Sequence, residues 1–334
     1  MKKLILLLAL LCLPLVASAQ QGDALLTPDG TMYTINYERA KEHPDVETDS
    51  QIYLMLTMRR GDEVTKEIVP ATRDLKGSHS NPAIAYDAQS GMLFAFWINN
   101  PSMVANQLMF ASRAADGTWT DPVSFGVYYN TRHNLRIAVT RKFEDETGNL
   151  RNGLVVHLAW WQFNFETNRH EAQYMLLSVA RNGGVEMMPV DLNQFIPKGL
   201  EPAIGATDSE VLRQPMLFTS AKQDSVLVVY GDLESATLHN VRITPKVAAD
   251  GRLRVPGGKR EVVSKSPTLE TGVTRIEGVY GDNDRLAFYA ETAGKLNYVL
   301  LKDGEWSTQR TISLDDQLSQ RAVIDALRRL VSEH

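Results

Sequence analysis

The sequence predicts an all-β protein, and three observations support this prediction. Up to about residue 312, apolar and polar residues alternate in short runs rich in Val, Ile, Leu, Tyr and Phe. Helical periodicity is nearly absent over the same stretch. The strand-like runs also recur in groups of four, with a glycine turn before the fourth. A repeated four-stranded unit predicts a β-propeller of about five blades, in which small sheets pack face to face around a channel.

The first 19 residues predict a secretory signal peptide. Lys2 and Lys3 form a positively charged start, and an apolar run too short to span a bilayer follows from residue 4 to residue 16. Ala17-Ser18-Ala19 fits the small-x-small cleavage rule. Cleavage after Ala19 predicts a periplasmic or secreted protein, and a single membrane anchor is the alternative. No later segment is apolar enough to cross a membrane.

Composition narrows the classes of partner and chemistry. Cys12 is the only cysteine and leaves with the signal peptide, so the mature chain is expected to lack disulfide and thiol chemistry. Losing the two lysines of the signal changes the formal net charge from −5 to −7, which disfavours nucleic acid and anionic lipid as partners. No cluster of His, Asp and Glu has the spacing of metal ligands, so no metal and no cofactor is expected.

Residues 20–312 form the predicted propeller. A first, less complete unit ends at Pro70, and four fuller units begin near Ser80, Leu135, Arg213 and Thr274. The glycines of the turn before each fourth strand are Gly61, Gly117, Gly183, Gly251 and Gly304. Successive turns are 53 to 68 residues apart, somewhat more than in the shortest propeller repeats. A pair of β-sandwiches is the alternative architecture.

Two of these turns carry a further motif. Asp116-Gly117 is followed by Trp119 in SRAADGTW, and LKDGEW ends at Trp306. Glycine adopts the positive φ of a tight hairpin freely, and the indole can pack over that hairpin. The pattern resembles the Asp-box, or BNR, repeat of sialidase-like propellers, Ser-x-Asp-x-Gly-x-x-Trp, with the serine displaced in the first copy and absent from the second. In that family the box lies on an outer hairpin away from the substrate cleft, so the resemblance implies a fold and not a chemistry.

Residues 313–334 predict a C-terminal amphipathic helix. Ser313 and Asp316 form a capping box, and apolar residues recur every four positions from Leu318. Arg328 and Arg329 suit the negative end of the helix dipole. The helix is expected to pack against the propeller, and docking to a partner is the alternative.

The predicted ligand site lies at the mouth of the channel, in the loops that lead into the innermost strands. Three consecutive units place an arginine near such a loop, namely Arg136, Arg213 and Arg275. Converging guanidinium groups bind a carboxylate or sulfate through bidentate hydrogen bonds. This pattern predicts an anionic glycan or an envelope protein as partner, and pairing of the arginines with carboxylates of neighbouring blades is the alternative.

The resemblance also implies candidate catalytic residues. A sialidase-like site would use the three arginines for the substrate carboxylate and Glu277 or Tyr280 in the nucleophile pair. The chain departs from that pattern, because LRIAV lacks the proline of the family's Arg-Ile-Pro run and no aspartate stands out as the acid. A comparison with five-bladed glycoside hydrolases implies instead that Asp29 and Glu277 act as base and acid across the scissile bond.

Histidines and tryptophans give further candidates. His79 and His133 lie near two adjacent loops and could act as base or acid in a lyase-like reaction on an anionic polysaccharide. His157 falls within a strand pattern and is assigned to the core. Trp97 and the pair Trp160-Trp161 either pack between blades or stack on a sugar. Residues 192–211 are not strand-like and are expected to cap one mouth of the channel.

Three functions follow from these patterns. The preferred one is a propeller that binds a glycan or protein partner at its channel mouth without catalysis. The second is a sialidase-like glycoside hydrolase or a polysaccharide lyase acting on an anionic sugar. The third is a structural component of an envelope complex.

Overall fold

The computed structural model describes residues 22–39, 52–75, 77–101, 106–128, 131–164, 169–187, 215–220, 222–232, 237–247, 249, 253–254, 260–262, 276–280, 286–292, 295–302 and 305–313. The predicted signal peptide and the predicted cap at 192–211 lie outside these ranges, as does the predicted helix beyond Ser313. Ser313, expected to cap that helix, is the last residue of strand β23 (Arg310–Ser313).

The described chain is almost entirely β-strand, which confirms the all-β prediction. Its strands form four sheets, of eight, six, four and five strands. Within these sheets we distinguish five successive antiparallel meanders, here called units one to five. Units one and two share the eight-stranded sheet, where a single parallel pair, Ile52 with Ser78, joins them. Unit one holds β1 (Gly22–Leu26), β2 (Met32–Arg39), β3 (Ile52–Arg60) and β4 (Glu63–Ile68). Unit two holds β5 (Ser78–Asp87), β6 (Met92–Asn100), β7 (Asn106–Arg113) and β8 (Val123–Tyr128). Unit three holds β9 (Thr131–Glu144), β10 (Leu150–Asn164), β11 (Arg169–Val179) and β12 (Val185–Met187).

Units four and five have the same plan with small additions. Unit four holds β13 (Met216–Thr219), β14 (Val226–Asp232), β15 (Thr237–Ile243) and β18 (Arg260–Val262). The short strands β16 (Lys246–Val247) and β17 (Leu253–Arg254) extend the sheet of unit three beside β9. Unit five holds β19 (Ile276–Tyr280), β20 (Leu286–Thr292), β21 (Lys295–Lys302), β22 (Glu305–Trp306) and β23. Both β22 and β23 pair with β21, so together they take the place of a fourth strand.

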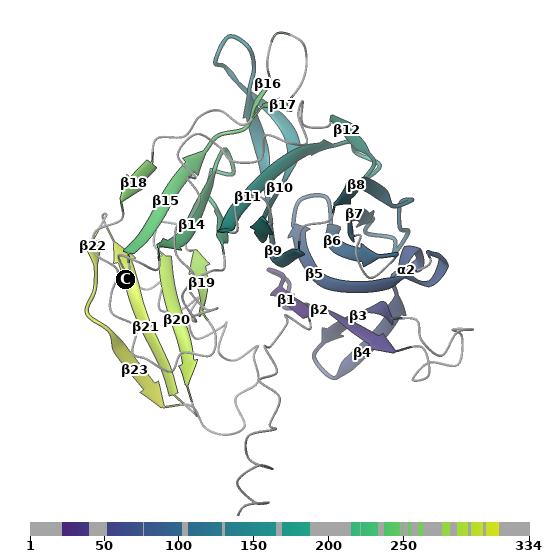
Figure 1. Cartoon of the computed structure of the whole chain (residues 1–334), viewed down its shortest axis with the longest axis horizontal. Coiled ribbons are helices and arrows are strands. Elements are labelled where there is room, and N and C mark those ends of the chain that lie inside the picture. The colour runs from purple at the N-terminus through teal and green to yellow at the C-terminus, as the bar shows by residue number, and fades with distance from the viewer. Residues whose placement is uncertain are drawn as a thin grey trace, which may run out of the picture.

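The units follow one another around an arc, from β1 to β23 in the order of the colour bar (Figure 1). The first strand of each unit contacts the first strand of the next, from β1 through β5, β9 and β13 to β19. Unit one has four strands, because β1 supplies the one that the sequence pattern left out. Antiparallel four-stranded sheets with adjacent first strands make the fold propeller-like.

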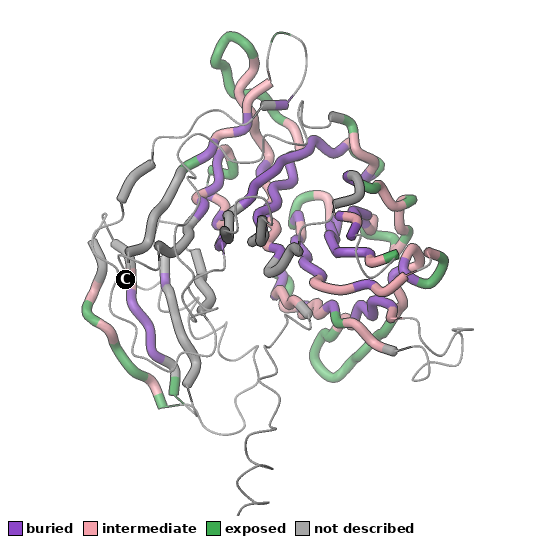
Figure 2. The backbone as a smooth tube through the Cα atoms, viewed as in Figure 1, coloured by how far each residue is buried: buried purple, intermediate pink, exposed green. Residues whose placement is uncertain are grey.

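The hydrophobic cores lie between neighbouring units, so the middle strands are buried on both faces. In β6, Leu93 and Trp97 face unit one, where they pack with Leu54 and Leu56. The alternate residues of the same strand, Phe94, Phe96 and Ile98, pack with Val156, Leu158 and Trp160 of unit three. A third core joins Val155 and Leu176 of unit three to Val226 and Val228 of unit four. Figure 2 shows buried residues along these strands and exposed residues at the turns.

Each unit has two ends with different contents. In an antiparallel meander, the turn after the first strand and the turn before the fourth lie at the same end, here called the turn end. The opposite end, where the first strands begin, is called the leading end. At the turn end, positive φ angles at Gly61, Gly117 and Gly183 agree with three of the predicted turn glycines. Gly251 and Gly304 lie outside the described residues.

The turns after the first strands also require a left-handed residue. Gly30, Gly91 and Gly148 have φ values of 82°, 72° and 84°. Each donates its N–H to the carbonyl three or four residues earlier. In unit four the same place is taken by Gln223, whose φ is 54° and whose N–H donates to the Ser220 carbonyl at 2.8 Å. Gln223 therefore adopts a conformation that three other units give to glycine.

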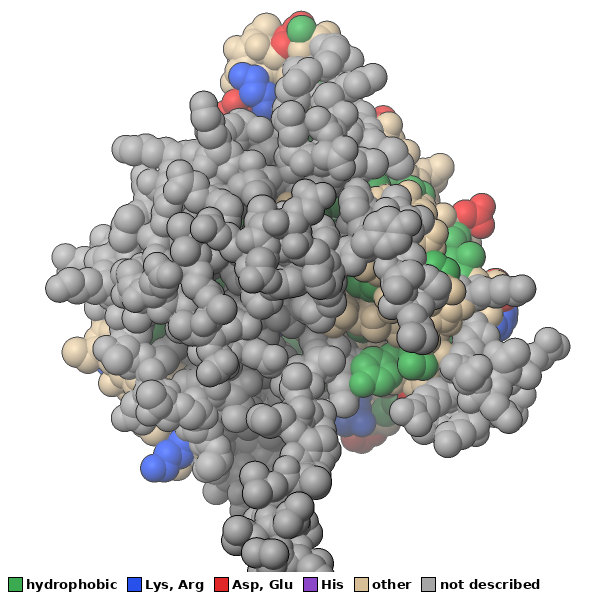
Figure 3. Space-filling view, in the orientation of Figure 1, with side chains coloured by type: hydrophobic (Ala, Val, Ile, Leu, Met, Phe, Trp, Pro, Cys, Tyr) green, Lys and Arg blue, Asp and Glu red, His purple; other side chains and the backbone are tan. Residues whose placement is uncertain are grey.

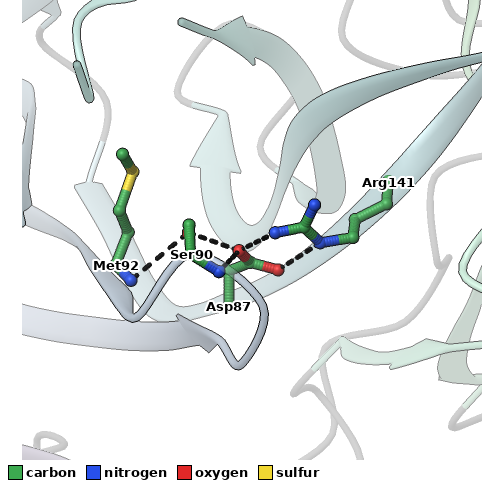
Figure 4. A network of polar contacts seen from close by, with 4 residues as sticks. All are labelled: Asp87, Ser90, Met92 and Arg141. Carbon is green, nitrogen blue, oxygen red and sulfur yellow. Dashed lines mark hydrogen bonds and ion pairs between the residues drawn. The ribbon is translucent and has the colours of Figure 1, made fainter. Parts of the chain in front are cut away.

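A polar network at the turn end joins units two and three, and Figure 4 shows four of its residues. Arg141 of β9 donates to Asp87 of β5, with Nε at 2.7 Å from Oδ1 and a second bond from Nη2 to Oδ2. The Ser90 N–H donates to the same carboxylate at 2.8 Å, and the Met92 N–H donates to Ser90 Oγ at 3.4 Å. The backbone N–H of Arg141 donates to the Gln223 carbonyl of unit four at 2.9 Å. Neighbouring units are thus held together by directed bonds as well as by apolar contact.

In the part of the chain that the structure describes, the five-residue α2 (Pro70–Asp74) is the only helix. No helix there is long and apolar enough to span a bilayer.

Candidate functional site

A β-bulge interrupts β5 near the leading end. The register shifts between Ser80 and Ala83, so that Asn81 and Pro82 lie opposite Trp97 alone. The φ of Asn81 is 49°, in the left-handed region that asparagine tolerates better than most residues. Bulges of this kind redirect side chains at the ends of sheets.

The first strand of unit three has a bulge at the same place. Here the register shifts between His133 and Arg136, and Asn134 and Leu135 lie opposite Trp160 alone. The two bulges therefore share an asparagine at their first position and a tryptophan on the partner strand. The leading end is built in the same way in units two and three.

The registers also give the position of Arg136 in its strand. Arg136 pairs with Ala159, the residue just before Trp160, and Met216 of β13 pairs with Val229, the residue just before Tyr230. Arg136 and Met216 therefore occupy equivalent positions in units three and four.

Only one of the three arginines is among the described residues. Arg136 is half-buried, and its Nη1 donates to the Leu135 carbonyl at 3.4 Å. Arg213 and Arg275 lie outside the described ranges, with Arg275 directly before the first residue of β19. Their convergence on one ligand stays a prediction.

His79 is a buried residue of β5 and not part of an open loop. Trp97 Nε1 donates to His79 Nδ1 at 3.1 Å, and His79 Nε2 faces the Leu75 carbonyl at 3.4 Å. Since an indole N–H only donates, Nδ1 must accept, and the proton lies on Nε2. Burial lowers the pKa of His79 to about 4 despite the carbonyl contact. The ring is fully buried, which corrects the expectation of an accessible base or acid.

Asp29 lies at the turn end, whereas the predicted ligand site lies at the leading end, in the loops that lead into the first strands. The strand β1 precedes it, so Asp29 belongs to the turn into β2 at the turn end. Its carboxylate accepts hydrogen bonds from Thr27 Oγ1 at 2.5 Å and from the Thr31 N–H at 3.2 Å. The hydrogen bond from Thr27 contributes most to lowering the pKa of Asp29, and the bond from the Thr31 N–H lowers it further. Arg60 Nη2 also lies 4.0 Å from Asp29 Oδ2. The Asp29 carboxylate therefore stabilises the turn.

Glu277 lies at the leading end and Asp29 does not, which corrects the proposed base and acid pair. Glu277 is the second residue of β19 and pairs with Tyr289 in the ladder. Tyr280 is the last residue of the same strand, at the turn end. Their side chains lie outside the description, as does that of His133.

The tryptophans of the second strands pack between units. Trp97 and Trp160 are among the largest fully buried side chains, and each belongs to a core between neighbouring units. The sugar-stacking alternative therefore does not apply to either ring. Trp161 lies beside Trp160 in the strand, with a side chain outside the description.

His157 is a core residue, as the strand pattern predicts. It is fully buried, and its ring nitrogens lie 2.8 Å from Thr140 Oγ1 and 2.5 Å from Tyr174 Oη. Burial lowers the pKa of His157 to about 3, so the ring is neutral. Its two hydroxyl partners satisfy both nitrogens without a charge.

A cluster of uncharged polar side chains occupies the leading end of unit two, and the sequence analysis missed it. We call Ser80, Asn99, Asn100, Asn106 and Gln107 the amide cluster. Asn99 Nδ2 donates to Gln107 Oε1 at 3.0 Å, and Asn100 Nδ2 donates to Ser80 Oγ at 3.1 Å. The runs INN and ANQ, which flank the turn between β6 and β7, are the only sequence signal for it.

Gly77 packs directly against this cluster. Its φ is 124°, and a Cβ there would lie 2.5 Å from Asn99 Oδ1 and 2.7 Å from the Asn100 carbonyl oxygen. Only glycine fits a contact this close. The chain that enters β5 is therefore held against the amides of β6.

Among the described residues, no group of three or more His, Cys, Asp or Glu side chains is arranged to hold a metal ion. The described charged side chains visible in Figure 3 are spread around the outline of that face and do not gather into one patch.

Comparisons with known proteins give no family. No protein-family model matches the chain. No curated protein matches it either. The fold is similar to that of an AofleA mutant from Arthrobotrys oligospora, at 10% identity and a TM-score of 0.42, over 88% of this chain and 73% of that one. It is also similar to a glycosyl hydrolase from Bacteroides ovatus, at 12% identity and a TM-score of 0.37, over 87% and 86% of the two chains.

A third similar structure is an exo-1,5-α-L-arabinanase from a bovine ruminal metagenomic library. It shares 13% identity and a TM-score of 0.35, over 89% of this chain and 94% of that one. At these scores none of the three activities or names is transferred to this chain.

Proposed function

We propose that the protein is an exported five-bladed β-propeller that binds a glycan or a protein partner at its leading end. The observation that carries this proposal is the contact between first strands in chain order, β1 through β19. Strands in this order surround a common axis when the ring closes, so the segments that lead into them meet at one mouth. Propellers place ligands at such a mouth because many loops converge there.

The contents of the two ends support the choice of the leading end. The turn end holds bonds that the fold needs, including the Asp87–Arg141 pair and the Asp29 turn. The leading end of unit two instead gathers polar side chains of the amide cluster around a bulge. Binding residues are more common on such ends than in strand interiors.

The proposal includes the relation to sialidase-like propellers. Trp119 Nε1 donates to Glu67 Oε1 at 2.9 Å, and Arg113 Nε donates to the same oxygen at 2.6 Å. The indole of the Asp-box-like turn therefore ties unit two to unit one. This is a structural use of the motif, as the resemblance implies.

The second candidate is a glycoside hydrolase or lyase acting on an anionic sugar. The position of Glu277 at the leading end, next to Arg275 and Ile276 in the chain, favours it. Because Asp29 lies at the turn end, a glycoside hydrolase with Glu277 at the leading end would need another residue as its second catalytic group. The binding function therefore ranks first, and a structural role in an envelope complex is a form of the same protein-binding proposal.

A glycan microarray and a turnover assay test the proposal together. The chain from Gln20 onward is probed on neutral and anionic glycans, and the glycans that bind are incubated with it and analysed for products. The proposal predicts saturable binding without products. Products that disappear in Glu277→Gln support the second candidate. Absence of binding to every glycan and to envelope extracts would refute the proposed function.

A further inference from the structure

We propose that the outer edge of β4 in unit one is a dimerisation surface, where β4 of a second copy of this chain pairs with it as an antiparallel strand. The surface is separate from the leading end, so the inference goes beyond the proposed function. In strand addition of this kind, main-chain hydrogen bonds give the affinity and side chains select the register.

The strand β4 has a long and regular edge. It pairs with β3 over six residues without a register shift, and on its other side it pairs with no described strand. The outer strands of the other units are irregular or short. The pairing of β8 contains a register shift, β12 and β18 have three residues each, and β22 and β23 have two and four. Irregularity and shortness protect sheet edges from association, so β4 is the least protected of these outer edges.

The backbone of β4 has hydrogen-bonding groups that point away from β3. The β3–β4 hairpin has a two-residue loop, so the pair that closes it at Glu63 is hydrogen-bonded, and such pairs alternate along the strands. The Val69 N–H, which donates to the Leu54 carbonyl at 2.9 Å, continues the same alternation. Val64 and Lys66 therefore direct their N–H and C=O groups toward the open edge.

The side chains along this edge are exposed. Asp62 and residues 63–66 all lie on the surface. Val64 is 46% exposed, and among the described residues only Val64 and Leu150 are large hydrophobic side chains with such exposure. In the part of the chain that the structure describes, neither Asp62 nor Lys66 forms an ion pair. The edge therefore offers an apolar side chain between two charges of opposite sign.

One register pairs these groups with each other in two copies of β4. Because only alternate residues point outward, a symmetric antiparallel pair must be centred on one residue opposite itself. Centring on Val64 places the two valines opposite each other, and Asp62 of each copy then lies opposite Lys66 of the other. Cross-strand pairs of opposite charge stabilise a sheet.

The neighbouring registers are disfavoured by charge. Centring on Glu63 or on Lys66 places that charged residue opposite its own copy. Centring on Thr65 places Glu63 opposite Glu67 twice. Like charges directly opposite each other destabilise a strand pair, so the charges of β4 select the register centred on Val64.

Antiparallel pairing points the leading ends of the two copies in opposite directions. The strand β4 starts at the turn end, directly after the turn at Gly61, and runs toward the leading end. In the second copy it runs the other way, so a dimer would bridge two ligands, a consequence that rests on the proposed function. A strand pair of this length buries less surface than a permanent interface, so the dimer is expected to be weak.

Sedimentation velocity on the chain from Gln20 onward, from about 1 to about 200 µM, tests the inference with a second copy as the probe. We expect a monomer–dimer equilibrium. Val64→Pro removes an outward N–H and keeps the bonds to β3, so it should weaken the dimer about tenfold, since the symmetric pair loses two bonds. The control is Leu150→Ala, which removes the other exposed hydrophobic side chain and should leave the dimer unchanged.

A charge exchange tests the register without a change to the backbone. Asp62→Lys and Lys66→Asp each place like charges opposite each other, so each variant alone should dimerise roughly three- to tenfold more weakly. In a mixture of the two variants, both cross-strand pairs are again opposite in charge. The mixture should therefore form a heterodimer with the affinity of the unaltered protein.

Three results would overturn the inference. The first is a protein that stays monomeric at every concentration. The second is a dimer that the β4 variants do not weaken, and the third is a mixture that associates no better than its two components. The charge variants keep the test decisive if Val64→Pro does not fold. Each of these results leaves the proposed function standing, because glycan binding at the leading end does not require a dimer.

Discussion

Two buried histidines carry the clearest consequence at the scale of single residues. His157 and His79 are neutral in the folded protein because burial lowers their pKa values to about 3 and about 4. In the unfolded chain the same rings bind a proton near pH 6.5. Their contribution to stability is therefore complete above pH 6.5 and is lost as the pH falls toward 4 and then 3.

This gives a pH-dependent prediction for His157. Between pH 7.5 and pH 5, the free energy of unfolding should fall by about 2 kcal/mol for each of the two histidines, on top of any other titration. In His157→Gln the fall should be about 2 kcal/mol smaller. Urea denaturation at the two pH values measures it. An equal fall in both proteins would mean that His157 is protonated or exposed in the folded state.

Gln223 gives a second prediction at this scale. Its left-handed conformation costs a non-glycine residue about 1–2 kcal/mol, and the added freedom of glycine in the unfolded chain offsets roughly 0.4–1 kcal/mol. Gln223→Gly should therefore stabilise the protein by about 0.5–1 kcal/mol, measured by urea denaturation. Gln223→Ala keeps the strain and is the control. A destabilised glycine variant would show that the side chain, and not the backbone, stabilises this turn.

The sequence predicts single residues well where a pattern fixes their surroundings. His157 sits in an alternating strand, so its burial follows from period two. His79 is also buried in a strand. That strand begins earlier than the apolar pattern shows, because Ser78 and Ser80 are polar. A strand end made of polar residues looks like a loop in a single sequence.

At the scale of elements, the ion pair between Asp87 of β5 and Arg141 of β9 holds two neighbouring units together. Burial alone would raise the pKa of Asp87, but hydrogen bonds from Arg141 and Ser90 outweigh it and the pKa is lowered. The side chain of Asp87 is only 4% exposed, so removal of Arg141 would leave a buried carboxylate without its cation. Such losses are much larger than those of surface pairs.

A double-mutant cycle measures the interaction energy of Asp87 with Arg141 between units two and three. Arg141→Met alone should cost about 3 kcal/mol or more, and Asp87→Asn should recover part of that loss. The coupling energy should lie at about 1–3 kcal/mol. Chemical denaturation of the four proteins gives the value, with Arg151→Met, from an exposed pair with Asp145, as the control. A coupling near zero would mean that the pair is not formed in solution.

Gly183 gives a matched prediction for a turn. A Cβ there would lie 2.2 Å from Ser112 Oγ, which donates to the Gly183 carbonyl at 2.8 Å. At Gly148 the φ is similar but no atom lies within 4 Å of such a Cβ. Gly148→Ala should therefore cost about 1–2 kcal/mol from strain alone, and Gly183→Ala clearly more. Equal losses in thermal or urea unfolding would contradict the close contact between units.

Element placement follows from the sequence except where strands are irregular. The four-strand grouping of units two and three agrees with the alternation, and the turn glycines at Gly61, Gly117 and Gly183 have the expected conformation. In unit four the expected last strand divides into β17, which lies in the sheet of unit three, and β18. The alternation does not predict strand β1, because GDALL is short and has no aromatic or β-branched residue. It does not predict the bulges of β5 and β9 either, because one inserted residue leaves no mark in a single sequence.

At the scale of the whole molecule, export is the first property to test. If the signal peptide is cleaved after Ala19, the protein isolated from the periplasm or medium should begin at Gln20. Amino-terminal sequencing or intact mass measurement checks this. A protein that keeps Met1 through Ala19 in the membrane fraction would support the anchor alternative instead.

The overall plan of the molecule follows from repetition, and its closure does not. Alternating strands and recurring turns predict the small sheets, and cores between units form because both faces of each middle sheet are apolar. A closed ring also requires a contact between the last and first units, and no local pattern encodes it because the residues are far apart in sequence. The amide cluster is also a product of tertiary structure, because it joins three strands.

Distances between exposed turns test the five-unit ring most directly. The mature chain would have no cysteine of its own, so spin labels can be attached in pairs at exposed Asp62, Asp116, Asn182 and Arg310, in units one, two, three and five. Double electron–electron resonance then gives the distance from unit one to each of the others. A closed ring predicts that the distance from Asp62 to Arg310 does not exceed that from Asp62 to Asn182, since unit five is then one step from unit one. If Asp62 to Arg310 is the longest distance in the set, the units form an open row or stacked sheets, and the common mouth does not exist.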